Sequence, residues 1–205
     1  MEIAEIPAVA GLEFDEGPHI YRLDGLEIPS VSAVMTPLSN ARYSGINSRT
    51  LEKAAERGTE VHNAIENHIK YDITDIPAQN RGYFEAFLQW QRDANPIPVG
   101  SEVRICHRIM RYAGTADLVA YIDGKLTLVD YKTTYTVSDM SCSVQLEAYA
   151  QALKNVGVEI EQKMILHLTK DGKYDIHRYQ INDAERWRVF GALKTVHDYL
   201  AVNGK

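Results

Sequence analysis

The sequence predicts a mixed α/β (α+β) fold in which helices and strands pack in layers. Segments with apolar residues at helical spacing are interleaved with segments in which apolar residues alternate. Three of the expected strands follow one another directly, which favours an antiparallel meander over a doubly wound parallel sheet. We find no internal repeat and no Pro/Gly-rich linker, so residues 1–205 are expected to form a single domain with an N-terminal hairpin arm at about 15–35.

The first half of the chain is expected to hold one hairpin and two long helices. Asp24-Gly25 is a strong two-residue turn signal for the hairpin. Apolar residues at helical spacing indicate the helices, and Asn95-Pro96 ends the second of them. The expected ranges are 19–28 for the hairpin, 29–50 for loop and a short helix, about 50–70 for the first long helix and about 80–94 for the second.

The second half is expected to begin with a three-strand meander. Asp123-Gly124 marks the turn between its last two strands, and Asp171-Gly172 marks a later hairpin. Asn182 is a suitable N-cap for the final helix. The expected ranges are about 102–109, 112–122 and 125–132 for the meander, about 141–156 for a helix, and 160–169 and 173–181 for the later strands.

Charge and composition restrict the class of protein. The net charge of −6 argues against a protein that coats nucleic acid non-specifically, although a local basic rim can still guide a phosphate chain. Scattered surface charge is the plainer explanation for any single basic residue. The candidates for such a rim are Arg42, Arg49, Lys53, Arg57, Arg104, Arg108 and Arg111.

Cysteine usage and hydropathy indicate the compartment. Cys106 and Cys142 are the only cysteines and lack metal-ligand spacing, which predicts a reducing compartment and no iron–sulfur cluster, zinc knuckle or disulfide framework. No stretch approaches the roughly 18 apolar residues of a membrane span. The acidic stretch 1–17 lacks the basic flank and apolar core of a signal peptide. We therefore expect a cytoplasmic protein, in a bacterial or phage-infected cell, without a membrane partner.

The central hairpin, residues 114–134, carries the most informative chemistry. A two-residue turn at Asp123-Gly124 fixes the register of the hairpin. Asp117 is then expected directly opposite Asp130, and Thr115 opposite Lys132. Opposed carboxylates repel each other unless a positive charge lies between them.

A divalent metal ion resolves this repulsion. Asp130 and Lys132 share one face of their strand, so an apolar face becomes ionic at its end. Magnesium and manganese prefer oxygen ligands, and Lys132 then remains free to contact a phosphate or the attacking water. An exposed hairpin, with its acids in solvent and Lys132 in a casual ion pair, is the alternative. The hairpin by itself leaves both interpretations open.

The motifs around this hairpin resemble the PD-(D/E)XK nuclease superfamily, specifically its RecB-like and phage-exonuclease branch. Several short motifs occur in the order typical of that branch, although Ala116 replaces the proline before the first acid. In chain order the motifs are Pro29-Ser30-Val31-Ser32, the Gly-x-x-x-His pattern from Gly58 to His62, Asp117, Asp130-Tyr131-Lys132, and the Gln-x-x-x-Tyr pattern from Gln145 to Tyr149.

The resemblance implies a restriction-endonuclease-like core, a central mixed sheet flanked by helices. It also implies that Mg²⁺ or Mn²⁺ is held by His62, Asp117, Asp130 and the backbone carbonyl of Tyr131, and that Lys132 acts in catalysis with the two aspartates. The nucleic-acid path would be lined by Arg57, Gly58, Gln145 and Tyr149, and Glu102 and Thr133 are further candidates. The plainer alternatives are a structural histidine, an ordinary amphipathic helix at 145–149 and a surface glutamate.

The implied activity is metal-dependent cleavage of DNA, with exonuclease action favoured over endonuclease action. Phage-type recombination, replication or repair is the implied setting, and a single-strand annealing or recombination protein is a candidate partner besides DNA. A non-catalytic nucleic-acid-binding descendant of the same fold is a second hypothesis. A structural protein with coincidental motifs is a third. Strand preference, polarity, the number of metal ions and the oligomeric state are left open by the sequence.

Overall fold

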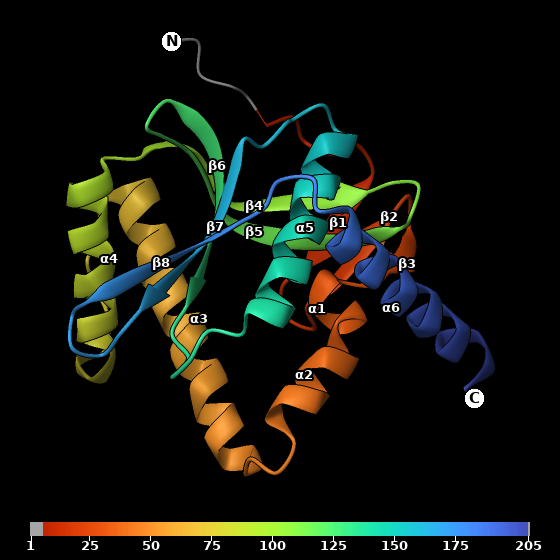
Figure 1. Ribbon diagram of the computed structural model, residues 1–205, viewed down its shortest axis with the longest axis horizontal. Helices are drawn as coiled ribbons and strands as arrows, with labels where there is room; N and C mark the ends of the chain where they lie inside the picture. Colours follow the sequence, from red (N-terminus) through yellow and green to blue (C-terminus); the bar gives the residue numbers. More distant parts are fainter. Residues whose placement is uncertain (1–5, 205) are drawn as a thin grey trace.

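A five-stranded mixed sheet forms the centre of the protein (Figure 1). The computed structural model describes residues 6–204, so the first residues of the acidic N-terminal stretch lie outside the described part. Among the described residues, no helix combines the length and the apolar character needed to cross a lipid bilayer. The strands, in spatial order, are β4 (Ile97–His107), β5 (Tyr112–Ile122), β6 (Lys125–Lys132), β7 (Gln162–Leu168) and β8 (Tyr174–Tyr179).

Strand directions confirm the mixed architecture. β4, β5 and β6 form the expected antiparallel meander, and β7 and β8 form the expected later hairpin. β6 and β7 run parallel, because helix α5 (Asp139–Asn155) makes the crossover between them. Parallel pairing next to a meander gives the mixed sheet that the resemblance implies.

Helices cover both faces of the sheet (Figure 1). The long helices α3 (Ser48–Tyr71) and α4 (Arg81–Ala94) pack on one face, where Phe87 and Trp90 are fully buried. α5 and α6 (Ala184–Asn203) pack on the opposite face with the short helix α1 (Val31–Val34). One apolar core therefore lies on each side of the sheet.

The N-terminal segment forms a small sheet of its own. The hairpin predicted at Asp24-Gly25 is present as β2 (Ile20–Leu23) and β3 (Leu26–Ile28), and an unpredicted strand β1 (Leu12–Asp15) pairs with β2. Tyr21, Leu23 and Ile28 pack on Cys106 and Ala113 of the main sheet. Ser30 caps α1, and helix α2 (Thr36–Tyr43) follows it. The short 3-10 helix η1 (Ala78–Asn80) precedes α4.

Two predicted boundaries are wrong, each for a local reason. β4 begins at Ile97, about five residues before the expected start, because an edge strand tolerates Pro98 beside a register shift at Pro98/Gly100. The last helix is capped by Asp183 rather than Asn182, since the Asp183 carboxylate accepts the free N–H groups of Glu185 and Arg186.

Candidate active site

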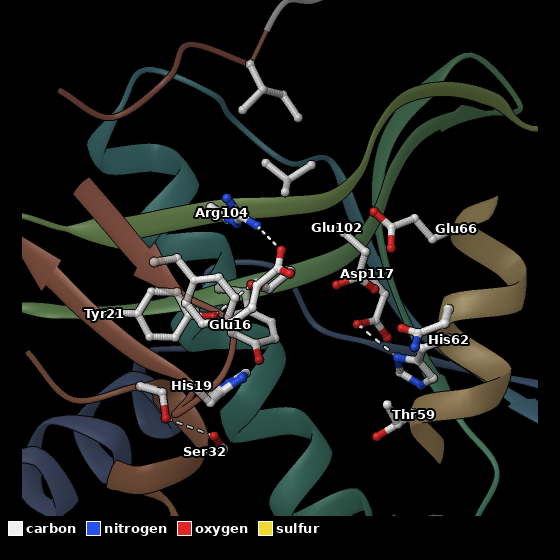
Figure 2. Close-up of a pocket in the computed structure, with 18 of the residues that line it drawn as sticks. Glu16, His19, Tyr21, Ser32, Thr59, His62, Glu66, Glu102, Arg104 and Asp117 are labelled. Carbon is white, nitrogen blue, oxygen red and sulfur yellow. Dashed lines mark hydrogen bonds and ion pairs between the residues drawn. The ribbon is translucent and has the colours of Figure 1, made fainter. Parts of the chain in front are cut away.

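The candidate site lies where α3 passes over the central strands. Figure 2 shows His62 on α3 pointing toward Asp117 on β5, with Glu102 on β4 beside them. The two acids come from neighbouring antiparallel strands, and the pairings on both sides of Glu102 place it across from Asp117. Three residues far apart in the sequence therefore meet at one point of the sheet.

His62 is held at both ring nitrogens. Its Nδ1 lies 3.5 Å from Asp117 Oδ1, and its Nε2 donates to the backbone carbonyl of Tyr131 at 3.2 Å. Burial alone would lower the pKa of His62, but the charge and hydrogen bond of Asp117 raise that pKa to about 9. In the metal-free protein this imidazole is therefore protonated at both ring nitrogens and positively charged at neutral pH.

Asp117 is buried and acts as the hydrogen-bonding centre of the group. Its Oδ2 accepts the backbone N–H of Tyr131 at 2.7 Å. Burial by itself would raise the pKa of Asp117, but His62, Lys132 and the Tyr131 N–H hold that pKa below its usual value. This carboxylate is therefore ionised, and it links β5 to the end of β6.

Glu102 lies at a break in the regular strand geometry. Its φ of +53° is unusual for a residue other than glycine, especially within a strand. Across from it, Ala116 and Leu118 pack into cores on opposite sides of the sheet, so the alternation of β5 is broken at Asp117. Burial and the nearby Asp117 raise the pKa of Glu102 to about 7. The irregular backbone thus holds two carboxyl groups close together.

These three side chains form a donor set that fits a divalent metal ion. One ligand atom each from His62, Glu102 and Asp117 lie within 4.8 Å of one another. Two carboxylates and an imidazole suit Mn²⁺ or Mg²⁺, and a cation would offset both the burial and the repulsion from Asp117 that raise the pKa of Glu102. The Tyr131 carbonyl, within hydrogen-bonding distance of His62, offers a further oxygen next to this set.

Asp130 and Lys132 form a second, adjoining part of the site. Lys132 Nζ lies 2.6 Å from Asp130 Oδ2, and the Asp130 residue is 2% exposed. Burial raises the pKa of Asp130 to about 6, although Lys132 opposes this shift. The pKa of Lys132 is raised because the attraction of Asp130 and Asp117 outweighs the effect of burial. The ammonium group is therefore charged and lies between the acids and α5.

Asp117 and Asp130 do not lie directly opposite each other, so this prediction is wrong. The hairpin register is as expected from Ile122–Lys125 to Leu118–Val129, but the ladder ends there. Asp117 and Asp130 are not paired, because the alternation of β5 breaks at Asp117 and its carboxylate binds the Tyr131 N–H instead.

The Thr115–Lys132 pairing also fails to form. The β5–β6 ladder ends before these residues, which are paired on their other sides: Thr115 with Arg104 of β4 and Lys132 with His167 of β7. Asp130 accordingly lies outside the compact donor set of His62, Glu102 and Asp117, although its charge still acts on both His62 and Lys132.

A cleft of about 980 Å³ opens beside the donor set. Its walls are α3 on one side and the N-terminal sheet on the other, and its floor is formed by β4 and β5 (Figure 2). Thr59, His62 and Glu66 project into it from α3, while His19 and Tyr21 face them from the small sheet. The metal donors are therefore accessible to a ligand of the size of a few nucleotides.

The two helix motifs reach the cleft to different extents. Gly58 lines it, and a Cβ added there would meet nothing closer than Thr133 Oγ1 at 4.0 Å, so packing does not require a glycine at this position. Tyr149 also lines the cleft, and Gln145 donates to its hydroxyl at 3.3 Å. A Cβ on Gly114 would lie 2.7 Å from the Tyr149 ring. Gly114, which the sequence analysis did not select, is thus what lets Tyr149 approach β5.

Arg57 and the predicted basic rim residues make contacts within the protein. The Arg57 guanidinium donates to the Thr133 carbonyl at 3.1 Å and to Thr133 Oγ1 at 3.4 Å, and it stacks over the Tyr83 ring. Within the basic rim, Arg104 and Arg108 form ion pairs with Glu16 and Asp24. Arg42 donates to the Thr136 carbonyl. Several of the predicted rim residues therefore already have partners within the protein.

The chain matches one family model and has weak similarity to solved structures. Residues 41–191 match the family model of the PD-(D/E)XK nuclease superfamily. Comparison with curated proteins finds no match. Among solved structures, one of SSO0001 is similar over 71% of this chain and 74% of its own, with 13% identity and a TM-score of 0.41. One of LHK-Exo in complex with dAMP is similar over 86% of this chain and 93% of its own, with 14% identity and a TM-score of 0.36.

The matched region contains the donor set and the Asp130–Lys132 pair, although not the cleft wall formed by the N-terminal sheet. It includes α3 with His62, the meander with Glu102, Asp117, Asp130 and Lys132, and the crossover helix α5. The match also covers well over half of the chain. The chain therefore belongs to the PD-(D/E)XK nuclease superfamily.

Proposed function

We propose that this protein is a metal-dependent deoxyribonuclease that hydrolyses phosphodiester bonds in the cleft between α3 and the N-terminal sheet. The observation that carries the proposal is the meeting of His62, Glu102 and Asp117 within 4.8 Å, beside the Asp130–Lys132 pair. With His62 neutral, the three carboxylates and one ammonium leave an excess of two negative charges. One Mg²⁺ or Mn²⁺ ion would balance that excess.

The donor residues have distinct roles in this proposal. Asp117 is the central ligand, since it is ionised and held by the Tyr131 N–H. Glu102 and His62 complete the set, and the Tyr131 carbonyl and Asp130 are further oxygen donors on β6. When bound, the cation lowers the pKa of a coordinated water and neutralises charge that develops on the phosphate. His62 must lose its proton before it can act as a ligand.

Lys132 supplies the positive charge that the protein itself brings to the reaction. Its ammonium group is charged and about a quarter of its side chain is exposed, so it can contact a phosphate oxygen or orient the attacking water. Asp130 holds the ammonium in place through their ion pair. A fixed positive charge stabilises the phosphorane-like transition state because no reorganisation is needed as negative charge develops.

The finer proposals follow the RecB-like and phage-exonuclease resemblance. We propose exonuclease action with a 5′-phosphate product, in phage-type recombination, replication or repair in the cytoplasm, and a single-strand annealing or recombination protein as partner. Gly58 and Tyr149 would lie along the DNA, since both line the cleft, with Gln145 supporting Tyr149. Arg57 would act by fixing Thr133 and the loop after Lys132. A single domain would contain both the metal donors and the DNA-binding residues.

Digestion of labelled DNA tests the proposal. Single-stranded, blunt double-stranded and covalently closed circular DNA are incubated with Mg²⁺, Mn²⁺ or EDTA, using wild type and the Lys132→Met variant. We expect metal-dependent release of short products from DNA ends, loss of activity in EDTA and loss in Lys132→Met. Cleavage of closed circles would establish an endonuclease instead. Binding of DNA without cleavage under any metal condition would favour the non-catalytic alternative.

A further inference from the structure

An aromatic group forms the wall of the cleft opposite α3. The rings of Phe14, His19 and Tyr21 pack against one another with centroid distances of 4.5–5.6 Å. The Arg104 guanidinium lies 4.9 Å from the centre of the Phe14 ring and is held there by an ion pair with Glu16. All of these residues line the same cleft as the metal donors. We call Phe14, His19 and Tyr21 the aromatic wall.

The aromatic wall is anchored to the strands that carry the acids. Tyr21 is buried, and its hydroxyl hydrogen-bonds to Thr115 Oγ1 at 2.7 Å. Thr115 precedes Asp117 by two residues on β5, and Arg104 follows Glu102 by two residues on β4. The wall and the metal donors are therefore fixed to the same short segments of backbone, which gives the two features a defined relative position.

His19 is the exposed member of the wall. It lies at the end of the turn between β1 and β2 with a φ of +55°, and its ring stands nearly perpendicular to both Phe14 and Tyr21. Edge-on packing against two rings fixes the imidazole while leaving its surface accessible from the cleft (Figure 2). A positive φ is unusual for a residue other than glycine, so the turn holds His19 in a strained backbone conformation that costs folding free energy.

We propose that the aromatic wall is a stacking site for a base of an unpaired DNA strand whose phosphate is at the metal donors, with the exposed His19 ring as the stacking face and Phe14 and Tyr21 as its support; the inference rests on the proposed function. Aromatic side chains stack on any base, because every base has a π-face. A base inside a duplex is already stacked and paired, so it cannot offer that face. The preferred substrate is therefore a single strand or a frayed end rather than the interior of a duplex.

Fluorescence of a terminal base tests this assignment. Lys132→Met serves as the parent for binding, with Mn²⁺ present and intact DNA verified on a gel. Oligonucleotides carry 2-aminopurine at the 5′ or the 3′ end, as single strands and as blunt duplexes. His19→Asn removes the ring but tolerates the left-handed backbone, and Phe14→Leu is paired with Phe14→Tyr, which keeps a ring. Tyr199→Ala, at an exposed tyrosine on α6, is the matched control.

The expected result separates base stacking from other roles. Single-strand binding should quench 2-aminopurine in the parent, and His19→Asn and Phe14→Leu should each weaken this binding about tenfold and lose the quench. Phe14→Tyr and Tyr199→Ala should match the parent, and blunt-duplex binding should change little. Unchanged single-strand binding in both ring-removing variants would overturn the stacking site, as would equal losses for single strand and duplex. The nuclease proposal fails separately, if wild type cleaves no DNA with either metal.

Discussion

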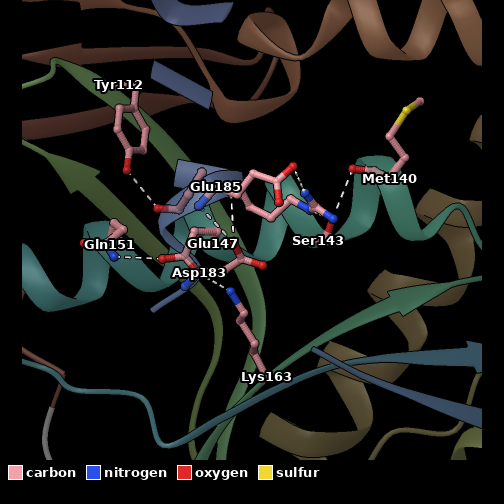
Figure 3. Close-up of polar contacts among 10 residues, drawn as sticks. Tyr112, Met140, Ser143, Glu147, Gln151, Lys163, Asp183 and Glu185 are labelled. Atoms are coloured by element: carbon pink, nitrogen blue, oxygen red, sulfur yellow. Dashed lines mark hydrogen bonds and ion pairs between the residues drawn. The ribbon is translucent and has the colours of Figure 1, made fainter. Parts of the chain in front are cut away.

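Of two groups of buried charged side chains among residues 6–204, one around Glu147 and one around Asp117, the second opens to a cleft. Glu147 on α5 and Lys163 on β7 are both essentially unexposed and form an ion pair (Figure 3). The Glu147 carboxylate also accepts from Gln151 Nε2 at 2.8 Å and from the Asp183 N–H at 3.2 Å. The charge of Glu147 is therefore balanced by that of Lys163, and the Glu147 carboxylate accepts two further hydrogen bonds.

The group around Asp117 differs in balance and in access. Three acids face one lysine and one histidine, and in the metal-free protein burial together with the nearby Asp117 raises the pKa values of Glu102 and Asp130. His62, Glu102 and Asp117 also line the cleft, so an external cation can reach them. Burial of charge is common to both groups. An unbalanced charge that is accessible from a cleft distinguishes the candidate active site from the structural pair.

The closed pair still contributes to the site indirectly. It joins α5, β7 and the start of α6, and α5 is further tied by Tyr112, whose hydroxyl donates to the Ala148 carbonyl, and by Arg186, which donates to Ser143 (Figure 3). α5 carries Tyr149 into the cleft. The balanced group therefore positions a helix that the unbalanced group needs.

Lysine-to-methionine substitution should reduce stability in the Glu147 group and cleavage activity in the Asp117 group. These are the largest effects expected. Lys163→Met leaves Glu147 as an unpaired buried charge, which costs about 3–5 kcal/mol of unfolding free energy. Lys132→Met should reduce the cleavage rate about a hundred- to a thousandfold. It should cost much less stability, since Asp130 already has a raised pKa and can take up a proton. Urea unfolding and cleavage of labelled DNA measure the two effects.

A double variant sharpens this comparison. Glu147→Met combined with Lys163→Met removes both charges of the closed pair, and apolar replacement of a buried pair is often neutral. We expect the double variant to recover most of the stability lost in Lys163→Met while keeping its cleavage activity. Comparable stability losses for Lys132→Met and Lys163→Met would show that the two groups do not differ in the way their charge balance indicates.

Local patterns predicted the strands of the main sheet and the long helices, though not β1, and they selected His62 and Asp117 as candidate ligands. Turn signals at Asp24-Gly25 and Asp123-Gly124 act over a few residues, so the hairpins and their register could be predicted. His62 and Asp117 were found because their motifs stand at fixed spacing. The break in alternation at Asp117 lies across from Glu102, whose φ is positive. No local pattern indicates this irregularity, and a glutamate near the start of a strand is usually a surface residue, so Glu102 was only a lesser candidate.

The closed pair was missed for a different reason. Glu147 lies between Gln145 and Tyr149, and a glutamate on a helix normally faces solvent. α5 is instead covered nearly all round, by β7 and α6 as well as by β5. Lys163 gave no clear signal either. It follows Glu161 and Gln162 directly before the apolar run Met164–Leu166, where a lysine is expected at the exposed start of a strand.

His62→Gln should weaken metal binding without loosening the fold. Removal of one ligand from a small donor set should lower Mn²⁺ affinity about 10–100-fold, and cleavage should fall with it. The melting temperature in EDTA should change little at about pH 10, above the raised pKa of His62, where the protonated pair with Asp117 no longer stabilises the fold. The other contacts of His62 are one backbone carbonyl and the edge of the Tyr131 ring. Calorimetric titration with Mn²⁺ measures the affinity. A large drop in the metal-free melting temperature at that alkaline pH, with affinity preserved, would make His62 a structural residue like Glu147.

Metal affinity should increase with pH, by about tenfold per pH unit between 7 and 9. The pKa of His62 is raised to about 9, so below that pH a proton must leave the imidazole before the cation can bind. Below about pH 7 the proton on Glu102 adds to the dependence, since its pKa is raised to about 7. Calorimetry in buffers of different ionisation enthalpy counts the protons released. An affinity that is constant from pH 7 to 9 would remove His62 from the donor set.

The smallest expected effect is on the stability of Asp130→Asn in EDTA. Burial raises the pKa of Asp130 from 3.8 to about 6, so the folded protein binds this proton more tightly than the unfolded chain does. Wild type should therefore lose stability relative to Asp130→Asn as the pH rises from about 4 to about 6, and the difference should then stay constant. At pH 7.5 we expect the variant to be more stable by on the order of 1 kcal/mol.

Two contributions oppose each other in this last variant, and their balance decides which group Asp130 resembles. Asparagine removes the cost of a buried negative charge but also removes the ion-pair partner of Lys132. Lys132 keeps the attraction of Asp117, which also raises its pKa, so the loss is partial. Urea unfolding of both proteins at pH 4 and pH 7.5 measures the difference. A variant that is clearly less stable than wild type at pH 7.5 would mean that the Asp130–Lys132 pair stabilises the fold as Glu147–Lys163 does, and that the unbalanced charge lies with Glu102 and Asp117 alone.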